Sequence, residues 1–322
     1  MSKSAKIWLT IAASLVLLGC VLFAVAMTVL NWDFTKLSTD NFDTSLHEIT
    51  EEFNSISINT STADLVFIPT EDGVCAVECH EQSNLKHRAF VKDGTLIIEV
   101  VDTRKWYDYI GIQINTPKIS VSIPQGDYEK LSIKSDTGDV KIPRELGFES
   151  IDIDESTGDV TVLSHVSGSV RIKTSTGKIF MEDCSAESLD LTVSTGDVTV
   201  TDVTCEGSIS VCVSTGKAFL TDIKCKSVTS SGNTGDISFC RVVAEESISV
   251  KRSTGDVKLD GSDAAEILIE TDTGDVEGSL LADKVFIVRT DTGDVDVPSS
   301  ITGGRCEITT DTGDIKISVK PQ

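Results

Sequence analysis

An internal repeat of 19 or 20 residues constrains this chain more than any other feature of its 322 residues. The dipeptide Thr-Gly recurs ten times at that interval, each time preceded by Ser, Asp or Asn and followed by Asp or Lys. A unit this short cannot bury its own apolar face, so neighbouring copies must stack on one another. The repeated glycines are Gly138, Gly158, Gly177, Gly196, Gly216, Gly235, Gly255, Gly274, Gly293 and Gly313.

Apolar residues alternate with polar ones on both sides of each glycine. All ten copies are apolar seven residues before the glycine and two residues after it. A period of two is typical of β-strands, and the inward phase changes across Thr-Gly-Asp, which predicts a structural turn there. The pattern predicts an all-β, single-domain β-solenoid, with ten coils of 19–20 residues over residues 131–322 and neighbouring strands about 4.8 Å apart.

The residues before this array are less regular. Ser61-Thr62-Ala63-Asp64 reads as a degenerate copy with alanine in place of glycine, and residues 74–79 and 96–101 read as a hairpin-like pair. We interpret residues 46–130 as an N-terminal cap with the first degenerate coils. The last repeat ends at Val319, which predicts an open final coil that pairs with a second copy of the chain. The alternative is a twisted, charged edge in a monomer.

The N-terminus has the composition of a membrane anchor. Residues 7–30 are uncharged and mostly apolar, and about 20 such residues span a bilayer as a helix. Lys3 and Lys6 precede the span, so residues 1–6 are predicted to be a cytoplasmic tail. Residues 31–45 then form a polar tether, and the repeats lie outside a bacterial cytoplasmic membrane. The alternative is lipoprotein cleavage at Cys20, which follows Leu-Leu-Gly.

The Ser/Asp-Thr-Gly-Asp-Val repeats behind a short membrane segment resemble the bacterial β-strand-repeat family often labelled "putative adhesin", and are similar to the toastrack group of envelope domains. The resemblance covers residues 46–319. It implies a β-solenoid outside the cytoplasmic membrane and an association with adhesion or envelope-stress signalling. The family supplies no functional residues that can be placed on this sequence.

The charge balance excludes one class of partner. The chain carries 51 acidic and 28 basic side chains, a net charge of −23. Nucleic-acid binding needs clustered Lys and Arg, so we expect no DNA or RNA partner.

An acidic row runs through the second half of the repeats. The aspartates after the glycines, Asp256, Asp275, Asp294 and Asp314, follow one another without a lysine. Carboxylates repeated at about 5 Å repel one another, and calcium could bridge them. The alternative is a solvated row of turn residues, screened by salt. We expect no other cofactor. Asp-Thr-Gly also occurs in aspartic proteases, but here Ser or Asn replaces the Asp in other copies, which indicates a turn.

One aromatic cluster lies outside the membrane segment. Trp106, Tyr107 and Tyr109 stand in the irregular stretch between residues 102 and 117. Such rings could stack on a sugar or anchor a partner protein. The alternative is a loop folded over the cap.

Eight cysteines follow the membrane segment. Cys205 and Cys225 both lie nine residues after their glycines, so a disulfide between adjacent coils and two free thiols both remain open. Cys212 and Cys306 are predicted to point into the core as small hydrophobic residues.

A zinc site has little support in the sequence. Cys75, Cys79, His80 and His87 fit no standard zinc spacing, and a strand would separate the ligands. No arrangement of nucleophile and base is visible.

These patterns together favour a non-enzymatic, membrane-anchored module for envelope interaction or stress sensing. Its expected partners are the membrane, another envelope or membrane protein, or a second copy of the chain. Two alternatives remain: a surface adhesin for glycan or protein, and a polysaccharide-acting β-helix enzyme.

Overall fold

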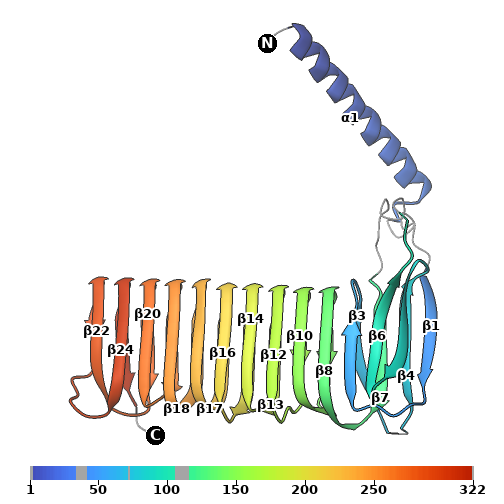
Figure 1. Ribbon diagram of the computed structural model, residues 1–322. Coiled ribbons are helices and arrows are strands. Elements are labelled where there is room, and N and C mark those ends of the chain that lie inside the picture. The colour runs from blue at the N-terminus through green and yellow to red at the C-terminus, as the bar shows by residue number, and fades with distance from the viewer. Residues whose placement is uncertain (1–2, 34–41, 72, 106–115, 321–322) are drawn as a thin grey trace.

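The computed structural model describes residues 3–33, 42–71, 73–105 and 116–320. One helix, α1 (Lys3–Val29), precedes 25 strands that stack side by side (Figure 1). The fold is the predicted all-β solenoid behind one N-terminal apolar helix. Each coil consists of a strand that ends at the repeated Thr-Gly corner and a strand that begins after it.

The strands that end at the corner are β8 (Gly126–Thr137), β10 (Leu146–Thr157), β12 (Ser169–Thr176), β14 (Ser188–Thr195), β16 (Ser208–Thr215), β17 (Ala218–Thr234), β18 (Ile237–Thr254), β20 (Glu266–Thr273), β22 (Lys284–Thr292) and β24 (Gly304–Thr312). The strands that follow it, besides the first halves of β17 and β18, are β9 (Val140–Ile142), β11 (Val160–Val162), β13 (Ile179–Ala186), β15 (Val198–Cys205), β19 (Val257–Ser262), β21 (Val276–Leu280), β23 (Val295–Asp296) and β25 (Ile315–Val319).

Equivalent strands of neighbouring coils pair in parallel and in register. Ile172 of β12, for example, lies beside Leu191 of β14, which lies beside Val211 of β16. These three side chains are at most 1 % exposed and belong to one continuous core inside the coils. The inward phase changes across the corner as the alternation predicts. Stacking therefore buries the apolar face that a single repeat would expose.

The corner requires glycine for two separate reasons. All ten repeated glycines have φ between 123° and 157°, which L-residues with a side chain rarely adopt. A Cβ on any of them would also lie 1.9–2.1 Å from a backbone oxygen of the adjoining coil. Gly138 approaches the carbonyl of Ala63 in this way, so residues 61–64 form the degenerate corner that the sequence indicated.

A second corner was not predicted. Five consecutive coils have a residue with φ of 52–59° six positions after the glycine, namely Asp183, Asp202, Asp222, Arg241 and Gly261. Asp and Gly tolerate this left-handed conformation. The recurrence of Asp at this offset was the signal in the sequence. Arg241 is the exception, and its guanidinium makes a two-pronged ion pair with Asp222 on the neighbouring coil.

The N-terminal end of the stack is closed by strands that are not repeats. These are β1 (Phe42–Ile49), β2 (Ser55–Asn59), β3 (Asp64–Thr70), β4 (Cys75–Gln82), β5 (Leu85–Lys92), β6 (Thr95–Asp102) and β7 (Lys118–Pro124). β2 lies between β6 and β8, while β4 pairs antiparallel with β1 and β7. The expected pairing of residues 74–79 with 96–101 is wrong, because β6 forms its hairpin with β5 through Asp93 and Gly94.

The C-terminal end does not follow chain order. β24 lies between β20 and β22, and β25 lies between β21 and β23 (Figure 1). The expectation that the last repeat forms the open edge is therefore wrong, since the preceding repeat forms it.

A buried lysine contacts residues two coils away in this order. Lys284 of β22 reaches past the final coil, where Gly304 has no side chain, and its Nζ lies 2.6 Å from Asp263 Oδ1 and 2.7 Å from the Ala264 carbonyl oxygen. A buried ammonium needs such partners, and this contact joins the two coils on either side of the final repeat.

Polar residues line the core beside the corner. Three positions before the glycine, the buried side chains include Ser135, Glu155, Thr174, Arg252, Thr271 and Thr310. Glu155 is 1 % exposed, and its Oε2 has no hydrogen-bond partner among the described residues. Burial therefore raises its pKa from 4.5 to about 7. Arg252 extends over Gly232 and donates from Nη1 to the Val213 carbonyl oxygen at 2.6 Å.

We predict that Glu155→Gln stabilises the folded protein in a pH-dependent way. A raised folded-state pKa means that ionisation opposes folding, an effect absent below the ordinary glutamate pKa and complete above pH 7. The substitution should add about 1–3 kcal/mol to the free energy of unfolding at pH 8 and little at pH 5. Urea unfolding at both pH values measures this. Asp154→Asn, at the exposed neighbouring position, is the control, and an equal gain at both pH values would contradict the prediction.

Candidate functional site

The aspartate row on the corner makes a regular set of backbone contacts. The Asp159 amide donates to Oδ1 of Asp139 at 2.9 Å, and the Asp275 amide donates to Oδ1 of Asp256 at 2.9 Å. Each carboxylate of the row except Asp294, in the end coil, accepts an N–H from the same position of the next coil. This role explains why Asp, the shortest carboxylate, follows the glycine.

The two lysines in this row interrupt the pattern. Lys178 and Lys217 donate their amides to Asp159 and Asp197, but their side chains offer no acceptor to the next coil. Lys217 Nζ instead lies 2.8 Å from Oδ2 of Asp236. Each lysine therefore lacks the hydrogen bond that an aspartate would accept from the next coil, but it reduces the repulsion between neighbouring carboxylates.

The four aspartates expected to bind calcium lie on this row in the order Asp256, Asp275, Asp314 and Asp294, because the last coil is inserted. Oδ1 of Asp256, Asp275 and Asp314 already accepts a backbone amide. The Asp294 amide and the Lys316 ammonium lower the pKa of Asp314. Calcium binding stays a prediction that would use the other oxygens.

The aromatic residues expected to bind a partner, Trp106, Tyr107 and Tyr109, lie outside the described residues. Their role stays a prediction.

The cysteines are free thiols in the structure. Cys205 and Cys225 are both buried, and burial raises the pKa of Cys225 to about 12, which makes its thiol unreactive. Cys306 is buried in the core as expected. The expectation for Cys212 is wrong, because it lies on the outward phase of β16 and is only half-buried.

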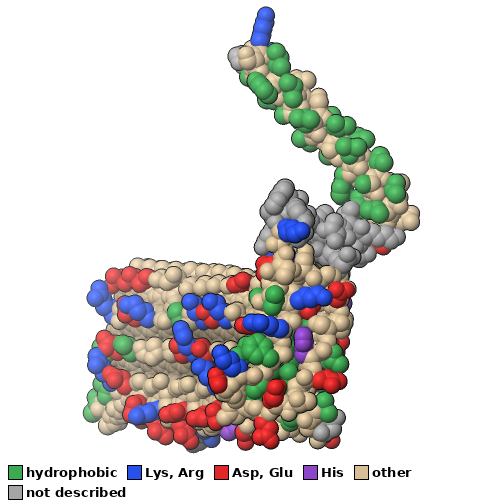
Figure 2. Space-filling model, turned by 45° about the vertical axis from the view of Figure 1, so that its right-hand side comes forward, with side chains coloured by type: hydrophobic (Ala, Val, Ile, Leu, Met, Phe, Trp, Pro, Cys, Tyr) green, Lys and Arg blue, Asp and Glu red, His purple; other side chains and the backbone are tan. Residues whose placement is uncertain are grey.

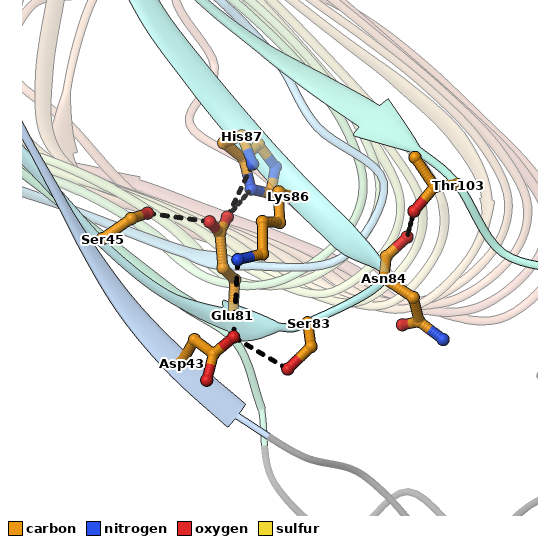
Figure 3. Close-up of polar contacts among 8 residues, drawn as sticks. All are labelled: Asp43, Ser45, Glu81, Ser83, Asn84, Lys86, His87 and Thr103. Atoms are coloured by element: carbon orange, nitrogen blue, oxygen red, sulfur yellow. Dashed lines mark hydrogen bonds and ion pairs between the residues drawn. The ribbon is translucent and has the colours of Figure 1, made fainter.

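A buried polar network ties four strands of the cap together. Glu81 of β4 and His87 of β5 are 1 % and 4 % exposed. Glu81 Oε2 accepts from the backbone N–H of His87 and contacts its Nδ1, both at 2.7 Å, while the Ser45 hydroxyl of β1 donates to Oε1 at 2.8 Å (Figure 3). Thr60, after β2, contacts His87 Nε2 at 2.8 Å. Around this core, Asp43 links to Ser83 and Lys86 (Figure 3).

Glu81 and His87, together with the nearby Cys79, offer three atoms of the kinds that bind metal ions. Cys79 Sγ, a Glu81 oxygen and a His87 nitrogen all lie within 4.8 Å of one another. Burial raises the pKa of Cys79 to about 12, and both ring nitrogens of His87 already have partners. His80, which the sequence placed beside Cys79 as a candidate zinc ligand, points outward, and its Nδ1 lies 3.1 Å from the Thr44 hydroxyl. The arrangement suits a hydrogen-bonded link between the cap strands better than a metal site.

The sequence analysis missed Glu81, which makes most of the contacts in this network. The sequence carries no signal for this contact, because a two-residue turn at Ser83 and Asn84 would place Glu81 opposite Lys86 and not opposite His87. Burial alone would raise the pKa of Glu81, but the hydrogen bonds from His87 and Ser45 outweigh it and hold the pKa below its usual value.

A shallow cavity of about 400 Å³ lies where the cap meets the regular coils. Its lining residues are Asn54, Asp127, Tyr128, Glu129, Phe148, Glu149, His165 and Ser167. The Tyr128 ring stacks between Phe53 and Phe148, with centroids 5.8 Å apart on each side. Carboxylates beside aromatic rings offer hydrogen-bond acceptors next to an apolar floor, which suits a ligand rich in hydroxyl groups.

We predict that Glu81→Ala loosens the cap and leaves the regular coils intact. The substitution leaves the buried His87 without its acceptor, which should lower the local unfolding free energy by about 3–5 kcal/mol. Amide hydrogen exchange of the full chain should rise in β1, β4 and β5 only. Since the pKa of Glu81 is lowered, the native network should hold above pH 4.5 and weaken as pH falls below that value. Glu78→Ala, at an exposed position of the same strand, should leave amide exchange unchanged. Equal exchange in both variants would contradict the role of Glu81 in holding the cap strands together.

One known protein family matches this chain over most of its length. A family model described as Toastrack DUF4097 matches residues 53–211 and 206–322. No curated protein matches the chain.

Three solved bacterial structures are similar to this chain at low sequence identity. A "putative lipid binding protein" of Parabacteroides distasonis is 17 % identical, with a TM-score of 0.47 over 75 % of this chain and 95 % of that one. A "putative adhesin" of Bacteroides fragilis is 15 % identical, with a TM-score of 0.40 over 87 % and 99 %. A "putative adhesin" of Parabacteroides merdae is 12 % identical, with a TM-score of 0.42 over 75 % and 97 %.

Proposed function

We propose that this chain, which belongs to the Toastrack DUF4097 family, is a non-enzymatic binding module held by α1 at the outer face of a bacterial cytoplasmic membrane. The observation that carries the proposal is the contrast between its two parts. α1 has 27 residues and exposed apolar side chains along its length, whereas the solenoid carries rows of charged side chains (Figure 2). A helix of this length and composition spans a bilayer.

The orientation follows from the distribution of charge. Lys3 and Lys6 precede the apolar run, and basic residues favour the cytoplasmic side. The chain that follows α1 is strongly acidic. An acidic surface repels anionic lipid headgroups, so α1 and not the solenoid makes the contact with the bilayer.

The distribution of polar groups supports binding over catalysis. Along the described solenoid, the exposed acids and bases recur at equivalent positions of successive coils, so they form rows without a convergent cluster. Among the described residues, the most deeply buried carboxylate–imidazole pair, Glu81 and His87, is enclosed in the cap, where a substrate could not reach it. A rigid array with long uniform faces suits a spacer or a partner-binding surface, as in envelope sensing.

A second candidate, a surface adhesin for glycan, is favoured by the cavity beside Tyr128. Its acidic acceptors and stacked rings match the hydroxyl groups and apolar faces of sugars. This candidate shares the anchor and the orientation of the first.

Labelling of intact cells with a membrane-impermeant amine-reactive cross-linker tests the proposal. Exposed lysines of the solenoid, such as Lys251, should react, and cross-linked partners should be envelope proteins. Lys3 and Lys6 provide an internal control and should react only after the cells are permeabilised. Labelling of Lys3 in intact cells, or of Lys251 only after permeabilisation, would contradict the orientation.

A further inference from the structure

The end of the stack opposite the cap has no covering element among the described residues. β22 pairs only with β24 and β23 only with β25, so one edge of each strand has no neighbour within residues 42–320 that the structure describes. Unpaired strand edges present rows of N–H and C=O groups. At the other end, β5, β4 and β1 close the stack with antiparallel strands that are not repeats.

The side chains that point into the coil are incompletely covered at this end. Phe286 and Val288 of β22 are only partly buried, whereas Cys306 and Ile308, at the same positions of the adjacent coil, are fully buried. Val295 is 46 % exposed, against 0 % for its equivalent Ile315. The cross-section of the core is therefore open to solvent, as it would be in any coil stripped of its neighbour.

The outward side of the end strand is also apolar. Val285 and Ile287 are 37 % and 49 % exposed, at positions where most other coils carry polar or charged residues. Ile301, in the loop that leaves β23, is 95 % exposed. A strand that is apolar on both faces is typical of sheet interiors, since an edge in contact with water usually carries charges.

We propose that this end packs against the same end of a second copy of the chain, with β22 antiparallel to its equivalent across a two-fold axis. A coil end is best covered by a cross-section of the same size and shape, and a second β22–β23 end supplies one. The exposed face of β22 carries one cation, Arg289, and one carboxylate, Asp291. These two side chains pair with each other at 3.0 Å, so the face has no net charge that would repel a second copy, although the chain as a whole carries −23.

The cap end fits this surface poorly. Its edge strand β5 exposes Lys86, Arg88 and Lys92, and such charges guard an edge against added strands. Pairing of like ends also closes the assembly at two chains, whereas pairing of unlike ends would give open filaments. The two-fold contact places the two caps, and the helices joined to them, at opposite ends of a doubled solenoid. Neither the contact nor this arrangement rests on the proposed anchor.

Sedimentation equilibrium of the full chain in detergent micelles tests the contact, with protein from about 1 to 100 µM. The wild-type chain should form dimers and no larger species. Ile287→Lys should weaken the dimer at least about tenfold, because it places a solvated charge on the paired edge. Leu268→Lys is the matched control, since Leu268 occupies the same repeat position and is 43 % exposed, but β20 is paired on both sides. This variant should dimerise like the wild type.

Three results would overturn the proposal. The first is a wild-type monomer at the highest concentration, which would leave the end to a different partner protein. The second is a dimer that survives Ile287→Lys unchanged, which would assign association to α1 in the micelle. The third is an equal loss in Leu268→Lys, which would show a general effect of charge on the solenoid surface. Unchanged hydrogen exchange of the β20 and β24 amides in Ile287→Lys verifies that the variant is folded.

Discussion

The structure depends on one close contact, the approach of backbone to backbone at the Thr-Gly corner. The repeated glycine amides donate to threonine carbonyls of the adjoining coil at 2.8–3.0 Å. The missing Cβ leaves just enough room for the neighbouring carbonyl. Because this contact recurs in every coil, it sets the spacing and register of the strands, and it aligns the aspartate carboxylates with the amides they accept. The apolar ladders can then pack in register inside the coils.

A stack held by identical contacts is uniform along its length, so any specific function belongs where the repetition ends. The cap holds Glu81 and His87, and the aromatic rings around Tyr128 lie where the cap meets the regular coils; neither group recurs along the stack. The opposite end exposes a strand that the other coils would cover. The chain thus separates a rigid, acidic shaft from two distinct ends, and the helix joins the end that carries the cap.

The repeat allowed the fold to be predicted because its signals are local. Alternation of apolar residues, the phase change and the ten glycines all fall within one coil, and stacking follows from the inability of that coil to fold alone. The order of coils at the two ends could not be predicted in this way. The corner sequences of the last three repeats are nearly identical, so any order satisfies them. The contact of Lys284 with Asp263 over Gly304 joins repeats that are two coils apart in the observed order, and no single repeat reports it.

The sites were harder to predict than the fold because their residues come from different strands. Glu81 meets Ser45 and Thr60 only after β1, β2 and β4 are placed in the cap, and no spacing in the sequence reports that placement. Cys212 was assigned to the core by its apolar character alone, although its parity relative to Val211 and Val213 places it outside. The backbone role of the aspartate row likewise required the register between coils.

The most direct test of this account compares two glycines that share a backbone conformation but differ in their surroundings. Gly196 has φ 139° and a Cβ position 1.9 Å from the Gly177 oxygen, whereas Gly126 has φ 146° and no atom within 4 Å. Denaturant unfolding of Gly126→Ala should show backbone strain alone, about 1–3 kcal/mol. Gly196→Ala should cost at least about 2 kcal/mol more, because two coils must move apart. Equal losses in the two variants would contradict the claim that close approach at the corner holds the stack together.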